Sequence, residues 1–181
     1  MNAMTARRLI CASVVLVGGL LAGCATPTTP DPSAEVPYCH KTNRGRVIAC
    51  TADPVPSLSA DAQAKQFAPD PNALTVYVVR RNWSDGQNFV KVQADDGVTV
   101  ETLPDTMVRY RLRPGSHTFA FNVEGQRSVT SVAGRAGEVR FIRIDGMVWI
   151  WKSTFTWANE SEDSIRERAL KARLIADLTV R

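Results

Sequence analysis

The stretch ALTVYVVR, residues 73–80, begins the regular part of this 181-residue sequence. It is a run of β-branched and aromatic residues, which pack well on a pleated sheet. Further along, VRYRLR at 108–113 and HTFAFNV at 117–123 alternate apolar and polar residues with a period of two, as half-buried strands do. Pro114-Gly115 between them favours a type II turn. We therefore expect residues 108–123 to form a β-hairpin.

Three other segments have strand character: NFVKVQ (88–93), EVRFIRI (138–144) and MVWIWKSTFTW (147–157). Short strands separated by glycine-containing turns are typical of two packed antiparallel sheets. The sequence therefore predicts a mainly β protein, with a small antiparallel β-sandwich of transthyretin or immunoglobulin type over residues 73–157.

The chain ends differently. Asn159 followed by Glu162 has the spacing of a helix capping box, and IRERALKARLIADL at 165–178 consists of good helix formers. An apolar stripe repeats every four residues along this segment: Leu170, Leu174 and Leu178. We expect residues 158–181 to form a C-terminal α-helix that packs on the sandwich.

The N-terminus has the layout of a secretory signal peptide. Arg7 and Arg8 precede the uncharged residues 9–23, which are too few to span a membrane, since a spanning helix needs about 20. Leu21-Ala22-Gly23-Cys24 resembles the bacterial lipobox. That resemblance implies removal of residues 1–23, a lipid on Cys24 and, because Ala25 follows, transport to the periplasmic face of the outer membrane. An uncleaved anchor is the alternative.

Removal of residues 1–23 changes the charge balance. The whole chain has 22 Lys and Arg against 18 Asp and Glu. Loss of Arg7 and Arg8 leaves 20 against 18, so the mature chain is close to neutral. It also has no basic low-complexity tract. We therefore expect no nucleic-acid partner, and the length fits one compact domain.

A proline-rich segment separates Cys24 from the rest. Residues 25–37 contain four prolines and no aromatic residue. They predict a lipidated tether over 24–37, an extended spacer of about 40 Å in the polyproline conformation. Residues 38–72 then form an irregular lead-in with one short helix near 59–67.

The cysteines sort by position. Cys11 leaves with the signal peptide and Cys24 carries the lipid, which leaves Cys39 and Cys50 as an even pair in an oxidising compartment. A disulfide is expected, and on the chain-entropy account it stabilises the fold by roughly 3 kcal/mol. The alternative is a metal or redox site that combines both cysteines with His40.

Catalysis is not indicated. His40 and His117 are the chain's two histidines, and neither sits in a recognisable catalytic motif. Nucleophile-elbow, phosphate-loop, HExxH and dinucleotide-binding patterns do not occur in the sequence. We expect a non-enzymatic protein with no cofactor and no metal.

Two sets of residues are candidates for binding. Along residues 147–157 the large aromatics fall at odd positions, so an unbroken strand would place them on one face: Trp149, Trp151, Phe155 and Trp157. Such a row can stack on sugars or anchor a protein, or it can be the sandwich core. The second set is the strand face of Arg109, Arg111 and Arg113, which can meet phosphate or carboxylate groups of lipid or cell wall, or pair with neighbouring acids.

Three segments carry a family resemblance: AKQFAPDPNALTVYVVRR (64–81), RYRLRPGSHTFAF (109–121) and AGEVRFIRI (136–144). In this order, and followed by a terminal helix, they resemble a widespread group of bacterial β-sandwich lipoproteins labelled as a domain of unknown function. The match runs over residues 64–178, and the cysteine loop before it is extra.

The resemblance implies no catalytic residues. Together with the lipobox it leads us to expect a lipid-anchored envelope protein that binds an envelope protein partner or assists assembly at the outer membrane. A glycan-binding or lipid-headgroup-binding module is the alternative.

Overall fold

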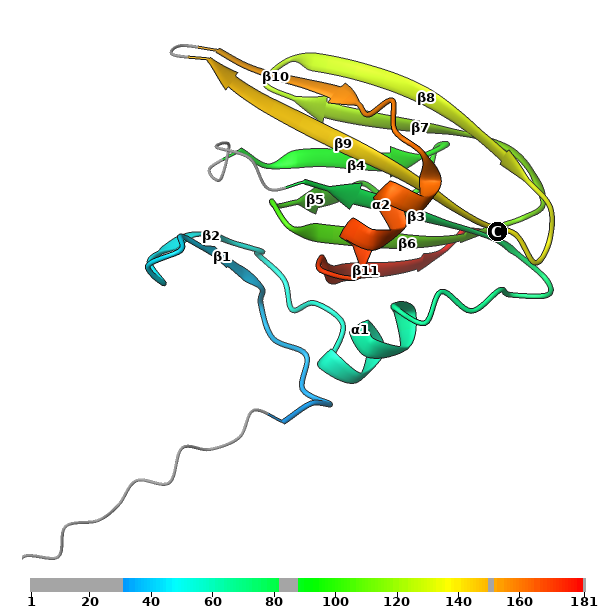
Figure 1. Cartoon of the computed structure of the whole chain (residues 1–181), viewed down its shortest axis with the longest axis horizontal. Coiled ribbons are helices and arrows are strands. Elements are labelled where there is room, and N and C mark those ends of the chain that lie inside the picture. The colour runs from blue at the N-terminus through cyan, green and yellow to red at the C-terminus, as the bar shows by residue number, and fades with distance from the viewer. Residues whose placement is uncertain (1–30, 82–87, 150–151, 181) are drawn as a thin grey trace, which may run out of the picture.

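Two β-sheets pack face to face in this protein (Figure 1). The computed structural model describes residues 31–81, 88–149 and 152–180. Two short helices accompany the sheets, one of them near the C-terminus. The predicted mainly β architecture of two packed sheets is thus confirmed.

The larger sheet has five strands. In spatial order they are β10 (Lys152–Trp157), β9 (Val139–Trp149), β3 (Leu74–Arg80), β6 (Thr106–Leu112) and β11 (Arg173–Thr179). Strand β3 runs antiparallel to β6 but parallel to β9, and β11 runs parallel to β6. The expectation of purely antiparallel pairing is therefore wrong for this sheet. Long connections, through the second sheet and through a helix, give its parallel pairs the crossovers that they require.

The smaller sheet has four strands, and all its neighbours are antiparallel. Its order is β5 (Val100–Thr102), β4 (Val90–Ala94), β7 (Gly115–Val123) and β8 (Gln126–Gly134). The predicted hairpin over 108–123 is wrong, because β6 and β7 belong to different sheets. Both strands turn their apolar side chains into the space between the sheets, where the Tyr110 and Phe119 rings meet edge to face at 5.4 Å. The chain therefore crosses from the five-stranded sheet to the four-stranded sheet at Pro114.

Strand β3 is buried on both faces. Val76 and Val78 point into the core between the sheets, whereas Tyr77 and Val79 point to the opposite side. All seven residues of the strand are buried. A strand covered on both sides needs apolar residues at successive positions, which explains why its sequence does not alternate.

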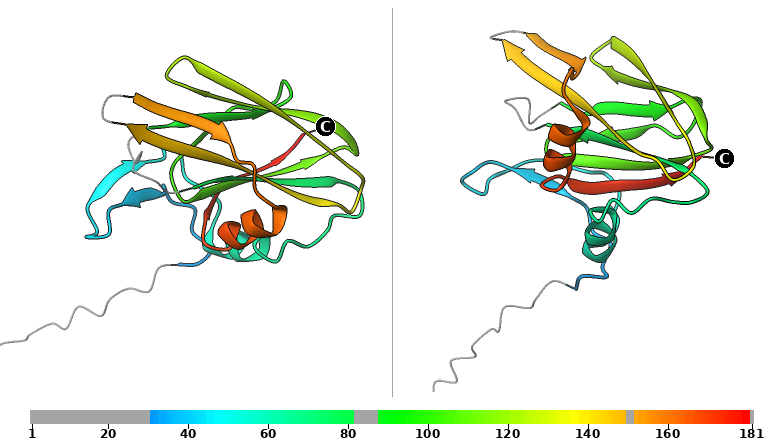
Figure 2. Two further views of the ribbon diagram at one scale, coloured as in Figure 1. Left: turned by 45° about the horizontal axis from the view of Figure 1, so that its top comes forward. Right: turned by 45° about the vertical axis from the view of Figure 1, so that its right-hand side comes forward.

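The outer face of the five-stranded sheet is covered by two helices and a loop (Figure 2). Helix α1 (Leu58–Ala64) begins at the cap Ser57. Helix α2 (Glu162–Ala169) begins at the cap Ser161 and packs Ile165 and Ala169 onto the sheet. Between the helices lies an aromatic cluster: Phe67 meets Tyr77 and Phe141 edge-on, each at 5.0 Å.

The predicted C-terminal helix over 158–181 is wrong beyond Ala169. Helix α2 ends there, and Arg173–Thr179 form strand β11 on the free edge of β6. The Leu170, Leu174 and Leu178 stripe therefore does not exist as a helix face. Pairing with β6 gives this segment backbone hydrogen bonds and buries Leu174, and that tertiary gain outweighs its helix propensity.

The segment 147–157 is not one strand. It contains the end of β9 and the whole of β10, which pair antiparallel with Trp149 opposite Lys152. The odd positions of the segment therefore do not form one continuous row, and the predicted aromatic row is wrong in that respect.

The lead-in forms a small hairpin of its own, β1 (Cys39–Lys41) and β2 (Val47–Cys50). The predicted disulfide between Cys39 and Cys50 is confirmed and closes this hairpin.

Residues 31–37 differ from an extended spacer. The Pro32 carbonyl accepts a hydrogen bond from the amide of Ser59, and Val36 pairs with Val55. The part of the tether before residue 31 lies outside the described residues.

Two buried tyrosines allow a matched test of the core. The Tyr77 hydroxyl donates to the Ala64 carbonyl at 2.8 Å, whereas the Tyr110 hydroxyl has no hydrogen-bond partner among the described residues. Burial also raises the pKa of Tyr110. Tyr77→Phe should lower the free energy of unfolding by about 1 kcal/mol, and Tyr110→Phe should leave it unchanged or raise it. Urea denaturation measures both, and an equal loss in the two variants would contradict this description of the core.

Candidate binding site

A pocket of about 400 Å³ opens beside helix α2, at the end of strand β3. Its described lining includes four cations and two acids: Arg80, Arg81, Arg168 and Lys171, with Asp105 and Glu167. Arg80 is buried and hydrogen-bonded, and Arg168 pairs with Glu160 at 3.6 Å, so Arg81 and Lys171 are the cations that can meet an anionic group here. We call it the basic pocket.

Three elements position these side chains. Arg80 ends β3, and Arg81 follows directly. Asp105 lies in the turn before β6, where its carbonyl accepts a hydrogen bond from the amide of Arg173 at 2.8 Å. Arg168 is in the last turn of α2 and Lys171 follows the helix. The last turn of α2 and the end of β3 therefore line the same pocket.

The two arginines from β3 differ in exposure. Arg80 is buried, donates to the Thr102 carbonyl and lies over the Phe155 ring, 5.6 Å from its centroid. Arg81 is half-buried and also lines a neighbouring pocket of about 380 Å³ with Asp145 and Met147. It is therefore placed to contact a ligand in either pocket.

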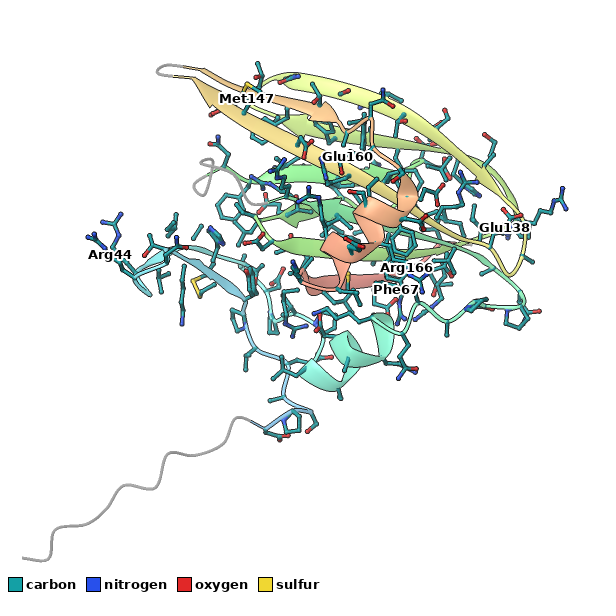
Figure 3. All side chains as sticks on the ribbon, viewed as in Figure 1. Arg44, Phe67, Glu138, Met147, Glu160 and Arg166 are labelled. Atoms are coloured by element: carbon teal, nitrogen blue, oxygen red, sulfur yellow. A yellow bond between two sulfur atoms is a disulfide. The ribbon has the colours of Figure 1, made fainter. Side chains whose placement is uncertain are left out.

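An ion pair between the buried Arg143 and the partly exposed Glu160 holds the start of α2 next to the basic pocket. Figure 3 labels Glu160 near α2. Arg143, on β9, donates to Glu160 at 2.5 and 2.8 Å and to Asp145 at 2.5 Å. The hydrogen bond from Arg143 is the main cause that lowers the pKa of Glu160 to about 2. Glu160 also accepts from the Ser164 hydroxyl at 2.9 Å. This network holds α2 at a fixed place on the sheet.

The described lining of the pocket contains one hydroxyl side chain and no histidine or cysteine. The Ser164 hydroxyl donates to the carboxylate of Glu160, whose lowered pKa makes it a weak base. Both histidines lie elsewhere: His40 is buried in the disulfide hairpin, and His117 contacts Asp95 at 2.7 Å and the Arg113 carbonyl at 2.8 Å. Within the described ranges, no group of three or more His, Cys, Asp or Glu is arranged to hold a metal ion. Electrostatic binding of an anion is what this geometry supports.

The predicted arginine face is occupied by another part of the chain. Arg109 and Arg111 both bind the carboxylate of Asp177 on β11, with Arg109 Nε at 2.9 Å and Arg111 Nη2 at 2.9 Å. The hydrogen bond with Asp177 raises the pKa of Arg109. Arg113 lies beyond the end of β6 and is exposed. The structure therefore uses two of the three arginines to hold β11.

The predicted tryptophans are not brought together as a described surface. Trp157 is half-buried and packs on Phe121 with ring centroids 5.2 Å apart, at the edge of the core between the sheets. Trp151 and the side chain of Trp149 lie outside the described residues.

Sequence reasoning missed the basic pocket. The pair Arg80-Arg81 directly after an apolar strand was a visible signal. Arg168 and Lys171 could not be added to it, because the helix was expected to continue through them and its contact with β3 is a tertiary feature.

The chain has no match among protein-family profiles, and a search of curated proteins found no similar sequence. None of the helices in the described part of the chain is long and apolar enough to cross a membrane.

The Arg143–Glu160 pair gives a pH-dependent prediction. Because folding depresses the pKa of Glu160 from its ordinary 4.5 to about 2, its contribution to stability is present above pH 4.5 and is lost as the pH falls towards 2. Because the Glu160 side chain is about a third exposed, solvent weakens the pair. Glu160→Gln should therefore lower the free energy of unfolding at pH 7 by about 1 kcal/mol, and the difference from the wild type should vanish near pH 2.

Glu162→Gln is the matched control. Glu162 pairs with Arg140, whose side chain is 40% exposed, whereas that of Arg143 is 1% exposed, so a smaller loss is expected at pH 7. Denaturant titration across pH measures all three proteins. A pH-independent effect of Glu160→Gln would contradict the role given to this pair.

Proposed function

We propose that the chain is a non-catalytic, lipid-anchored envelope protein that holds a partner protein at the periplasmic face of the outer membrane. The observation that carries the proposal is the basic pocket, a concave site in which Arg81 and Lys171 form no ion pair with the described residues. The partner is expected to present acidic side chains. Membership of the group of β-sandwich lipoproteins described above, and a transthyretin or immunoglobulin type of sandwich, are part of the same proposal.

Two features of the N-terminal region support the proposed location. Leu21-Ala22-Gly23-Cys24 supplies the lipidation signal, and Cys39 and Cys50 form a disulfide, which persists in oxidising compartments. Two or more acyl chains on Cys24 make a stable anchor. The domain would then act at the membrane surface.

The binding role is supported by the way the pocket is built. The Arg143–Glu160 pair holds the start of α2, so the cations on one side of the pocket are held relative to Arg80 and Arg81 on the other. A preorganised site loses less entropy on binding. The glycan- or headgroup-binding alternative would need residues other than Arg109 and Arg111, since Asp177 occupies both.

The anchor is tested by metabolic labelling. When the protein is expressed in bacteria with a labelled fatty acid, the wild type should carry label and Cys24→Ser should carry none. Cys11→Ser is the control and should keep the label, because Cys11 lies in the segment expected to be removed. Label that persists in Cys24→Ser would contradict the anchor.

The pocket is tested by charge reversal. Neither Arg81 nor Lys171 forms an ion pair among the described residues, so Arg81→Glu/Lys171→Glu should fold normally. In-cell cross-linking with mass spectrometry should detect a defined protein partner for the wild type, and at least tenfold less of it for this variant. Arg127→Glu/Arg135→Glu, with the same charge change at two exposed sites on and after β8, is the matched control. Equal loss in both variants would contradict the pocket's role.

A further inference from the structure

A second charged surface lies on the disulfide hairpin, away from the basic pocket. Residues 36–52 contain three cations, Lys41, Arg44 and Arg46, and no Asp or Glu. All three side chains are exposed, and none of them pairs with a carboxylate of the described residues. Figure 3 shows Arg44 at the tip of the hairpin, clear of the sheets.

Exposed apolar side chains adjoin these cations. A groove of about 520 Å³ lies between the hairpin, the first described residues and the start of α1. Three large apolar residues that line it are about half-exposed: Val36 (57%), Val47 (51%) and Leu58 (49%). Lys41 also lines the groove. Cations and half-exposed apolar groups are therefore together on one side of the protein.

The position of the anchor suggests what covers this side. Asp31, the first described residue, lines the same groove, and Cys24 is seven residues before it. Seven residues span at most about 25 Å even when fully extended. A lipid on Cys24 therefore keeps the membrane within that distance of the groove.

We propose that the hairpin and the groove contact the anionic lipid surface in which Cys24 is anchored. Basic residues are attracted to anionic headgroups, and apolar side chains beside them enter the boundary between headgroups and acyl chains. The disulfide holds Cys39 and Cys50 together and so keeps the cations on a closed hairpin. This inference rests on the proposed lipid anchor and assigns the orientation of the anchored domain.

The experiment uses the lipidated protein reconstituted into two kinds of vesicle, phosphatidylcholine alone and phosphatidylcholine with phosphatidylglycerol. Flotation first establishes that the protein is anchored in both. Hydrogen exchange is then compared for the amides of residues 38–48. The proposal predicts roughly tenfold slower exchange on the anionic vesicles, and loss of that difference at high salt.

Two variants sharpen the result. Arg44→Glu/Arg46→Glu should abolish the slower exchange on anionic vesicles, and the matched Arg127→Glu/Arg135→Glu control should retain it. Equal exchange on both kinds of vesicle, in a wild-type protein that floats with them, would overturn this proposal and leave the anchor standing. A protein that fails to float would overturn the proposed anchor itself.

Discussion

Burial of strand β3 on both faces is the constraint on which the rest of the structure depends. Its inner side needs the four-stranded sheet as a cover, and its outer side needs α2 and the ring of Phe67. Each buried valine or tyrosine side chain stabilises the folded state by on the order of 2 kcal/mol. Loss of either cover would therefore expose one face of β3 and lose this stabilisation. The basic pocket lies where β3 leaves this layer, next to the end of α2.

Arginines serve two purposes in this fold. Arg143 and Arg109 are buried on the outer side of the sheet, and carboxylates from later segments of the chain, those of Glu160 and Asp177, pair with them. Removal of one member of such a pair leaves a buried charge without its partner, so these pairs fix the positions of α2 and β11. Arg81 and Lys171 at the basic pocket, and the three cations of the disulfide hairpin, form no ion pair with the described residues and are placed for binding.

The sequence predicted the parts that rest on local patterns. The strand around Val76 follows from its β-branched and aromatic residues, and the strand around Phe119 follows from its alternation of apolar and polar residues. The Cys39–Cys50 disulfide follows from cysteine pairing in an oxidising compartment. It failed where a distant partner decides the structure. The segment at Leu174 has good helix formers but gains a place beside β6. The sequence between β9 and β10 contains no glycine or proline to mark the end of one strand and the start of the next. The basic pocket lies where α2 ends before β11, and so it was not predicted.

The central claim is that the anchored domain turns its hairpin to the membrane and its basic pocket to a protein partner. A photo-cross-linking residue placed in living cells at Asn43, on the exposed hairpin tip, or at Glu167, on the exposed rim of the pocket, tests both surfaces in one experiment. We expect lipid adducts from position 43 and a discrete protein adduct from position 167. A discrete protein adduct from position 43, with lipid adducts from position 167, would contradict the account.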